Sequence, residues 1–366
     1  MLTELHYQIA LTFVPNIGAV QAHTLVEQYS NASSIFKAKK TLLERTEGIG
    51  TIRANSIKNF NDFKRVEEEI TFLQKYQIEP LFLTHENYPK RFLHCYDPPT
   101  LLYYRGTANL NSSKVLAIVG TRINTEYGRQ VTEQLIKDLS IQDILIVSGL
   151  AFGIDAIAHK SSLKYDLPTV GVVGHGLDTI YPSQHAALAK EMIQHGGLLT
   201  EFCSKTKPDK HNFPIRNRVV AGMCDATVVV ETSIKGGSMI TAEMANSYNR
   251  DVFAVPGKTT DSKSAGCNHL VKTNKAILLT DAKQLIETLG WEDKKKKTVK
   301  IQRDLFISLS NEEKIITDIL KEKETVPIDE LLYSSKLSSS ELAAAILNLE
   351  FQNVIVCLPG KSYKLL

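Results

Sequence analysis

The chain has few cysteines and no pair of them at metal-binding or redox spacing. Only five occur in 366 residues, and they are scattered. They are Cys95, Cys203, Cys224, Cys267 and Cys357. Without a Cys-x-x-Cys pair, a zinc site or a disulfide scaffold is not expected. The sequence therefore predicts no metal, and idle thiols in a reducing compartment.

Long apolar runs are also missing. No stretch approaches the length that crosses a bilayer, so we expect no membrane span. The first residues, Met1-Leu2-Thr3-Glu4, lack the basic segment and apolar core of a secretory signal. We therefore expect a cytoplasmic protein.

Three catalytic or nucleotide-binding signatures are absent from the sequence. There is no Gly-x-x-x-x-Gly-Lys-Ser/Thr loop and no Gly-x-Gly-x-x-Gly after the first apolar strand. The Gly-x-Ser-x-Gly elbow of hydrolases is missing as well. These absences favour binding over turnover, with no cofactor.

Short apolar strands that end in glycine-bearing loops are the dominant pattern. Between residues 114 and 290 such strands alternate with helical segments, which predicts an α/β fold with a doubly wound, mostly parallel, Rossmann-like sheet. The predicted strands are Val115–Val119, Ile144–Val147, Thr169–Val173, Ala226–Val230 and Val252–Val255, with Leu101–Tyr104 joining from the preceding connector. Parallel strands place their carboxyl ends on one sheet edge, so the loops should cluster there and favour phosphates.

Two further regions flank this domain. Residues 1–75 show helical spacing and two Gly-Ile-Gly-like turns, at Asn16-Ile17-Gly18 and Gly48-Ile49-Gly50, which fit either a DNA-binding helix–hairpin–helix or plain turns in a helical bundle. The DNA-binding alternative is favoured slightly by the nearby basic residues Lys37, Lys39, Lys40, Arg53 and Lys58. We expect domains at 1–75, 76–290 and 305–366, with a basic linker at 291–304.

The C-terminal module reads as a winged helix. Three amphipathic helices precede a hairpin of Val354–Leu358 and Ser362–Leu365 joined by a Pro359-Gly360 turn. Its third helix, Ser338–Gln352, begins with a capping box and contains no lysine or arginine. Residues 305–366 hold six lysines and nine acidic residues, which gives this part a net charge of −3. Because the whole chain has a net charge of +3, the preceding 304 residues carry a net charge of +6. This argues against a duplex-binding regulator that uses the winged helix.

Two segments of the α/β region carry the candidate binding chemistry. Arg122 follows the first strand in Gly120-Thr121-Arg122, where a guanidinium can clamp a phosphate. The run from Lys210 to Arg218 holds three cations, Phe213 and two amides, a mixture that suits a single strand whose bases stack on the ring. The alternatives are a surface ion pair for Arg122 and a core position for Phe213. The predicted contacts are Gly120, Thr121, Arg122, Ser148, Gly149, Lys210, Phe213, Arg216, Asn217, Arg218, Gly236, Gly237 and Ser238.

Asp155 and His159 lie four residues apart and could form a general acid/base pair. The favoured alternative is a helix cap with a hydrogen bond between residues i and i+4.

These motifs together resemble the DNA-processing protein A family (DprA, also called Smf). The resemblance covers residues 80–290 and rests on motifs in the family's order: Ala117–Arg122, Ser148–Asp155 with His159, Gly176–Asp178 with Tyr181-Pro182, Phe213–Arg218 and Ala254–Gly257. Thr121 stands where the family commonly has serine, which keeps the hydroxyl group. The resemblance implies single-stranded DNA binding, with contacts at Arg122, Lys210 and Phe213. It also implies a homodimer formed through the Rossmann-like domain, and loading of the RecA recombinase during natural transformation.

A second resemblance is the alternative. The α/β region is similar to LOG-type nucleoside-monophosphate phosphoribohydrolases, whose signature is Pro-Gly-Gly-x-Gly-Thr-x-x-Glu. In this chain the proline of the signature is replaced by Lys235, its third glycine by Met239 and its threonine by Ile240. The matching residues that remain are Gly236, Gly237 and Glu243. These losses damage the catalytic loop, so hydrolysis is the weaker hypothesis.

Overall fold

The computed structural model describes residues 2–292, 309–323, 325–352, 354–358 and 362–365. The chain divides into two compact units, Met1–Glu292 and Asp293–Leu366. The linker predicted at 291–304 lies outside the described residues from 293 onward. The boundary predicted near residue 75 falls inside the first unit and stays a prediction.

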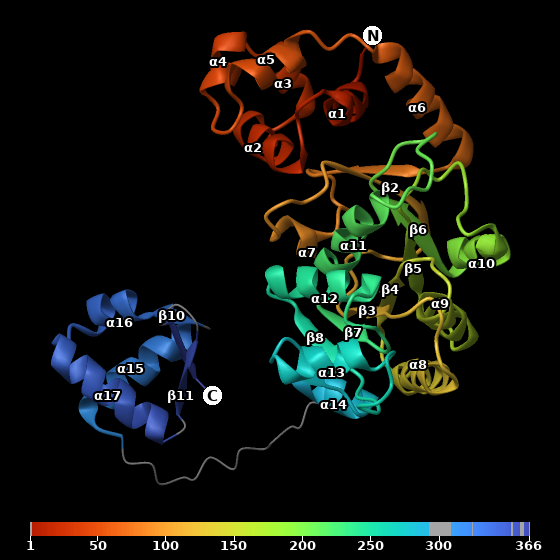
Figure 1. Cartoon of the computed structure of the whole chain (residues 1–366). Coiled ribbons are helices and arrows are strands. Elements are labelled where there is room, and N and C mark those ends of the chain that lie inside the picture. The colour runs from red at the N-terminus through yellow and green to blue at the C-terminus, as the bar shows by residue number, and fades with distance from the viewer. Residues whose placement is uncertain (1, 293–308, 324, 353, 359–361, 366) are drawn as a thin grey trace. The chain divides into compact units, whose positions relative to one another are not determined.

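Six helices form the N-terminal part of the first unit (Figure 1). They are α1 (Glu4–Phe13), α2 (Ala19–Tyr29), α3 (Ala32–Lys37), α4 (Lys40–Arg45), α5 (Gly50–Lys58) and α6 (Phe63–Tyr76). Arg53 links the two Gly-Ile-Gly-like turns, because its guanidinium donates to the carbonyl oxygens of Asn16 and Gly48, each at 2.9 Å. Lys58 donates to the carbonyls of Phe36 and Ala38 at the end of α3. Both cations therefore serve the helical bundle, which favours the plain-turn alternative for these two residues.

A nine-stranded sheet follows, in the order β1-β2-β6-β5-β4-β3-β7-β8-β9. Its strands are β1 (Glu79–Phe82), β2 (Leu101–Gly106), β3 (Val115–Val119), β4 (Leu145–Ser148), β5 (Thr169–Val172), β6 (Gly196–Thr200), β7 (Ala226–Val229), β8 (Asp251–Ala254) and β9 (Ile277–Leu278). The pairs from β6 to β9 are parallel, and β1 and β2 join antiparallel at one side. The predicted Rossmann-like, mostly parallel sheet is confirmed.

Helices cover both faces of this sheet (Figure 1). They are α7 (Lys90–Leu93), α8 (Glu126–Leu139), α9 (Ile154–Lys164), α10 (Ala186–His195), preceded by a 3-10 turn at Ser183–His185, α11 (Asn212–Gly222), α12 (Gly237–Ser247), α13 (Ala265–Lys272) and α14 (Ala282–Thr288). Every residue of β3 is buried, and its alternate side chains enter two different cores. A strand buried on both faces must be apolar throughout, which explains the unbroken run Val115–Val119.

The strand order reverses at β3. This strand pairs with β4 on one side and β7 on the other, so the chain proceeds away from β3 in both directions. Loops that leave β3 and β7 must diverge here, and a crevice opens at the carboxyl ends of the strands. This topology fixes where a ligand site can form.

The second unit is a winged-helix domain, as predicted. It contains α15 (Asn311–Glu322), α16 (Ile328–Ser335), α17 (Ser339–Phe351) and a sheet ordered β10-β12-β11, formed by Val326–Pro327, Ser362–Leu365 and Ile355–Leu358. The Ser338–Glu341 capping box is present. The predicted Pro359-Gly360 turn lies outside the described residues. The domain has a core of its own, which includes Ile316, Leu331 and Leu349.

Within the described ranges, no helix is long and apolar enough to cross a membrane. The same part of the chain holds no group of three or more His, Cys, Asp or Glu side chains placed to bind a metal.

Candidate nucleic-acid interface

A cleft of about 530 Å³ lies at the carboxyl ends of β3, β4 and β7. Its walls are the loops that follow these strands, together with the start of α11 and the start of α12. Most of the predicted contact residues line it: Gly120, Thr121, Arg122, Gly149, Lys210, Phe213, Arg216, Asn217, Gly236, Gly237 and Ser238. Residues almost 120 positions apart in the sequence therefore meet in one place.

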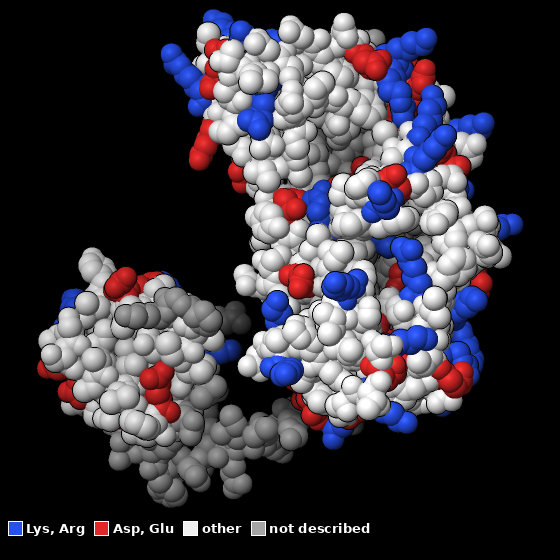
Figure 2. Space-filling view, viewed as in Figure 1, with Lys and Arg blue, Asp and Glu red and all other residues white. Residues whose placement is uncertain are grey.

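Two cations stand at the mouth of the cleft. Arg122 and Lys210 are both exposed and line it from different loops. Lys and Arg side chains also lie on the face of the molecule that carries α11 and α12 (Figure 2). These two cations can therefore neutralise the phosphates of a bound strand from two different loops.

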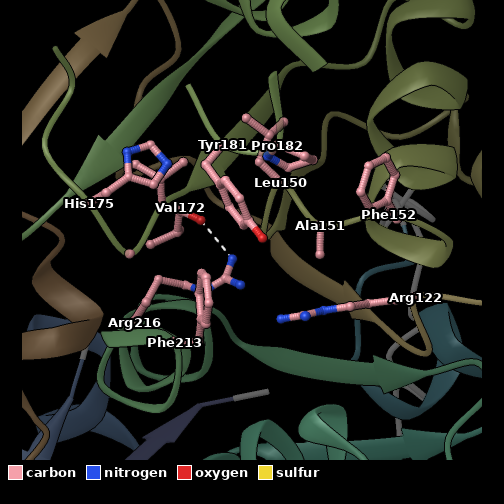
Figure 3. A pocket seen from close by; sticks show the side chains of 12 residues that line it. Arg122, Leu150, Ala151, Phe152, Val172, His175, Tyr181, Pro182, Phe213 and Arg216 are labelled. Atoms are coloured by element: carbon pink, nitrogen blue, oxygen red, sulfur yellow. Dashed lines mark hydrogen bonds between the residues drawn. The ribbon is translucent and has the colours of Figure 1, made fainter. Parts of the chain in front are cut away.

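The aromatic residue between these cations is half-buried. The Arg122 guanidinium lies over the Phe213 ring, 5.3 Å from its centroid (Figure 3). The Tyr181 ring stacks on Phe213, with centroids 6.0 Å apart and an interplanar angle of 28°. Phe213 is therefore part of the cleft wall and not of the core.

Tyr181 and Phe152 extend this aromatic surface beyond the predicted residues. Both line a small adjoining cavity together with Arg122 and Phe213. Tyr181 is 49% exposed and Phe152 is 44% exposed, so a ligand can reach both rings. The sequence offered a partial signal, since Tyr181 precedes Pro182 in one of the quoted motifs.

Arg216 lies on the floor and not at the mouth. It is 7% exposed, and its Nη1 donates to the carbonyl oxygen of Val172 at 2.7 Å (Figure 3). Burial raises the pKa of the neighbouring Asp155, although the Arg216 charge opposes that shift. A Cβ on Gly149 would lie 1.9 Å from Arg216 Nη1, so a larger residue here would displace the Arg216 side chain. Arg216 supplies positive charge from behind the surface.

The start of α12 forms the opposite end of the floor. Gly236 is the N-cap and provides no side-chain cap, so the first amide groups of the helix have no such partner. Asn217 on α11 donates from Nδ2 to the Gly237 carbonyl oxygen at 3.3 Å, which holds the two helices together at this point. The Ser238 hydroxyl is buried and has no hydrogen-bond partner among the described residues. The helix start can therefore accept an anion.

Two predicted contact residues lie elsewhere. Ser148 is fully buried, and its hydroxyl donates to the Ile118 carbonyl oxygen at 2.6 Å. Arg218 points to the other side of α11, where it pairs with Glu201 and Asp97 and lies over the Phe92 ring. Burial raises the pKa of Glu201 to about 7 even with this partner. Ser148 and Arg218 make contacts within the fold, and neither lines the cleft.

The Asp155 and His159 pair does not form an acid/base site. His159 is fully buried; Nε2 donates to the Gly149 carbonyl oxygen at 2.6 Å, and Nδ1 lies 2.7 Å from the Thr169 hydroxyl. Both ring nitrogens are thus used, so the predicted hydrogen bond from His159 to Asp155 is replaced by these two. Burial lowers the pKa of His159 to about 4, so the ring is neutral near pH 7.

Comparison with known proteins decides the family. The model of DNA recombination-mediator protein A matches residues 79–290, and that of the DprA winged helix domain matches residues 307–361. The chain belongs to the DNA recombination-mediator protein A family. It is 35% identical over 298 residues to protein Smf of Synechocystis, an alignment that covers 79% of this chain and 73% of that protein. DNA processing protein DprA of Bacillus subtilis is 36% identical over 241 residues, covering 65% and 81%.

Solved structures agree with this family. DNA processing protein A from Streptococcus pneumoniae superposes with a TM-score of 0.68 at 30% identity, covering 78% of this chain and 98% of that chain. The protein from Helicobacter pylori, described for its single-stranded DNA binding mode, gives 0.54 at 33% identity, covering 59% and 97%. The family membership does not favour the phosphoribohydrolase alternative.

Proposed function

We propose that the cleft binds single-stranded DNA and breaks no bond in it. The observation that carries this proposal is the combination of exposed Arg122 and Lys210 with a stacked Phe213 in a single cleft. Cations can bind the phosphates while an unpaired base stacks on the ring, and duplex DNA has no free base for this contact. The family membership and the Helicobacter pylori relative support the proposal.

In this proposal each part of the cleft has its own role. Arg122 and Lys210 hold the strand backbone at the mouth, with Gly120 and Thr121 supporting Arg122. Phe213 accepts a base. Gly149 and Arg216 shape and charge the floor, and Asn217 positions the α12 start formed by Gly236, Gly237 and Ser238.

Charge-matched substitutions test the mouth. We expect Arg122→Ala and Lys210→Ala each to weaken oligothymidine binding at least tenfold, about 1.4 kcal/mol. Arg129→Ala on α8 and Lys283→Ala on α14 remove the same charges outside the cleft and should leave binding nearly unchanged. Fluorescence anisotropy with single-stranded and duplex oligonucleotides measures both affinity and selectivity. Equal affinity for single and double strands, or equal effects of the two sets of variants, would contradict the proposal.

We further propose that the chain delivers the bound strand to the RecA recombinase during natural transformation. The support is the family alone, since the described residues point to no particular recombinase contact. A strand-exchange assay on DNA coated with single-strand-binding protein tests it: the chain should shorten the lag before RecA acts, and Arg122→Ala should not.

A homodimer formed through the Rossmann-like domain is also proposed. The edge strand β9 supports it, because Ile277 and Leu278 are 38% and 40% exposed on a strand with one unpaired side. Sedimentation analysis should show a dimer at micromolar concentration, and Leu278→Lys should shift it towards monomer. A monomer for the unsubstituted chain would exclude this part of the proposal.

Binding without turnover is testable separately. Both ring nitrogens of His159 are engaged in buried hydrogen bonds, so Asp155 and His159 do not act as an acid/base pair in the described cleft. We expect no free base to appear when the protein is incubated with nucleoside monophosphates. Released base, detected by chromatography, would favour the phosphoribohydrolase alternative.

A further inference from the structure

We propose that the floor of the cleft, at the start of α12, is a subsite for a terminal phosphate monoester of the bound strand. The proposal rests on the single-strand function above and adds a preference for phosphorylated ends. Its direct donor is Ser238 at the start of α12, and Arg216 adds positive charge from the other end of the floor. The mouth residues hold the strand backbone.

Two buried donors without partners mark this floor. The Ser238 hydroxyl and the Arg216 Nε each lack a hydrogen-bond partner among the described residues. Both side chains are 7% exposed, and both line the cleft. Buried donors are rarely left unpaired in folded proteins, so such groups usually have a ligand or a water as partner.

The chemistry of the floor is that of an anion site. Ser238 stands in the first turn of α12, an 11-residue helix whose N-cap Gly236 has no side-chain cap. The amide groups of the first turn and the positive end of the helix dipole favour negative charge there. A Cβ on Gly237 would meet nothing within 4 Å, so the helix start is open to a ligand.

One carboxyl group also lines the cleft and must be considered. Asp155 is buried beside Arg216, and burial raises the pKa of Asp155 while the positive charge of Arg216 lowers it. Arg216 also lines the cleft, so an incoming phosphate would meet this cation together with the carboxyl group. The Asp155 carboxyl thus weakens the site without excluding an anion.

The depth of the floor favours a strand end over an internal phosphate. Arg122 and Lys210 are exposed at the mouth, where a continuous backbone can pass, whereas Ser238 and Arg216 are nine-tenths buried. An internal phosphodiester has a sugar on both sides and one negative charge. A terminal monoester has one substituent, three free oxygens and a charge of about −1.5 to −2. It can enter end-on and use more donors.

Oligothymidines with different ends test the subsite. One strand carries a 5′-phosphate, one a 3′-phosphate and one only hydroxyl ends. Because the strand lies in the cleft with one polarity, we expect one phosphorylated end to bind about tenfold tighter than the hydroxyl-ended strand, and the other end to give no gain. Ser238→Ala should reduce this ratio to about one. Ser247→Ala, at the far end of α12, should keep it, and Arg122→Ala should weaken all three strands with the ratio retained.

The outcomes separate this inference from the proposed function. Equal affinity for all three strands would overturn the subsite while leaving single-strand binding intact. Equal gains at both ends that persist in Ser238→Ala would show a simple effect of added charge and would also overturn it. Thymidine monophosphates test the floor even if longer strands fail to bind. Calorimetry should detect the 5′- or the 3′-monophosphate but not thymidine, and binding of neither would contradict the subsite.

Discussion

At the residue scale, Arg122 and Phe213 depend on each other. The guanidinium lies over the ring, 5.3 Å from its centroid, so the cation is held beside the ring at the mouth of the cleft. Such a contact is worth about 0.5–1 kcal/mol at an exposed site. The pair is already assembled in the unbound chain, which reduces the entropy lost when a strand is bound.

The stacking role of Phe213 can be separated from its size. Phe213→Leu retains an apolar side chain but removes the aromatic face, so we expect oligothymidine affinity to fall about tenfold. Phe351→Leu, which changes an exposed phenylalanine on α17, is the matched control and should have no effect. Anisotropy titrations at one salt concentration give both values. An unchanged affinity for Phe213→Leu would mean that no base stacks on this ring.

Arg216 and Arg218 show what the sequence could not settle at this scale. Both belong to the predicted basic run, and both were expected to contact DNA. They are two positions apart on α11, which places them on nearly opposite faces of the helix. Phe213, Arg216 and Asn217 share the face that lines the cleft. Knowing that this run is helical would have shown that the two arginines lie on different faces. The composition of the run alone does not show this.

Glu201, the partner of Arg218, gives the chain a pH-dependent stability. Burial raises the pKa of Glu201 from 4.5 to about 7, so the folded state holds this proton more tightly than the unfolded state. The free energy of unfolding should therefore be largest below about pH 4.5 for this group and fall as the pH rises towards about 7. Glu201→Gln should flatten that fall in urea titrations, and Glu243→Gln on the exposed face of α12 should not. The same slope in Glu201→Gln and the unsubstituted chain would exclude this role.

At the element scale, a glycine-to-alanine change should have different effects at two places in the cleft, the start of α12 and the loop after β4. A Cβ on Gly237 meets nothing within 4 Å, so Gly237→Ala should fold normally but weaken strand binding by blocking the α12 start. A Cβ on Gly149 would meet Arg216 and Asp155, so Gly149→Ala should lower the free energy of unfolding by about 1–3 kcal/mol. Thermal unfolding and anisotropy distinguish the two effects. If both variants bind the strand as tightly as the unsubstituted chain, the strand does not approach these glycines.

The strands also show how far the sequence could predict the fold. The apolar runs of β3, β4, β5, β7 and β8 were predicted within about one or two residues of their observed limits, because strands buried on both faces are continuously apolar. β6 was missed, since it begins with two glycines. A Cβ on Gly197 would lie 2.4 Å from the Tyr104 ring, and one on Gly196 would lie 1.9 Å from the Thr169 carbonyl oxygen. Glycine serves close packing here, a requirement that only the neighbouring strands reveal.

At the scale of the whole molecule, the two units have separate cores. The winged-helix core shares no residue with the cores of the first unit, and α17 carries no lysine or arginine. We expect a chain of residues 1–292 to fold and to bind oligothymidine within about threefold of the full chain, because the cationic mouth lies entirely within it. Circular dichroism checks the fold and anisotropy the affinity. A loss of tenfold or more would place an essential contact in the winged helix.

The central claim is that a single strand lies in the cleft where the strand order reverses at β3. Photo-crosslinking tests it most directly: an oligothymidine that contains 4-thiothymidine is bound, irradiated and mapped by mass spectrometry on the full chain. We expect crosslinks in the peptides that carry Phe213 and Tyr181, and their loss in Arg122→Ala but not in Arg129→Ala. Crosslinks confined to the helices α1–α6 or to residues 309–365 would contradict the account.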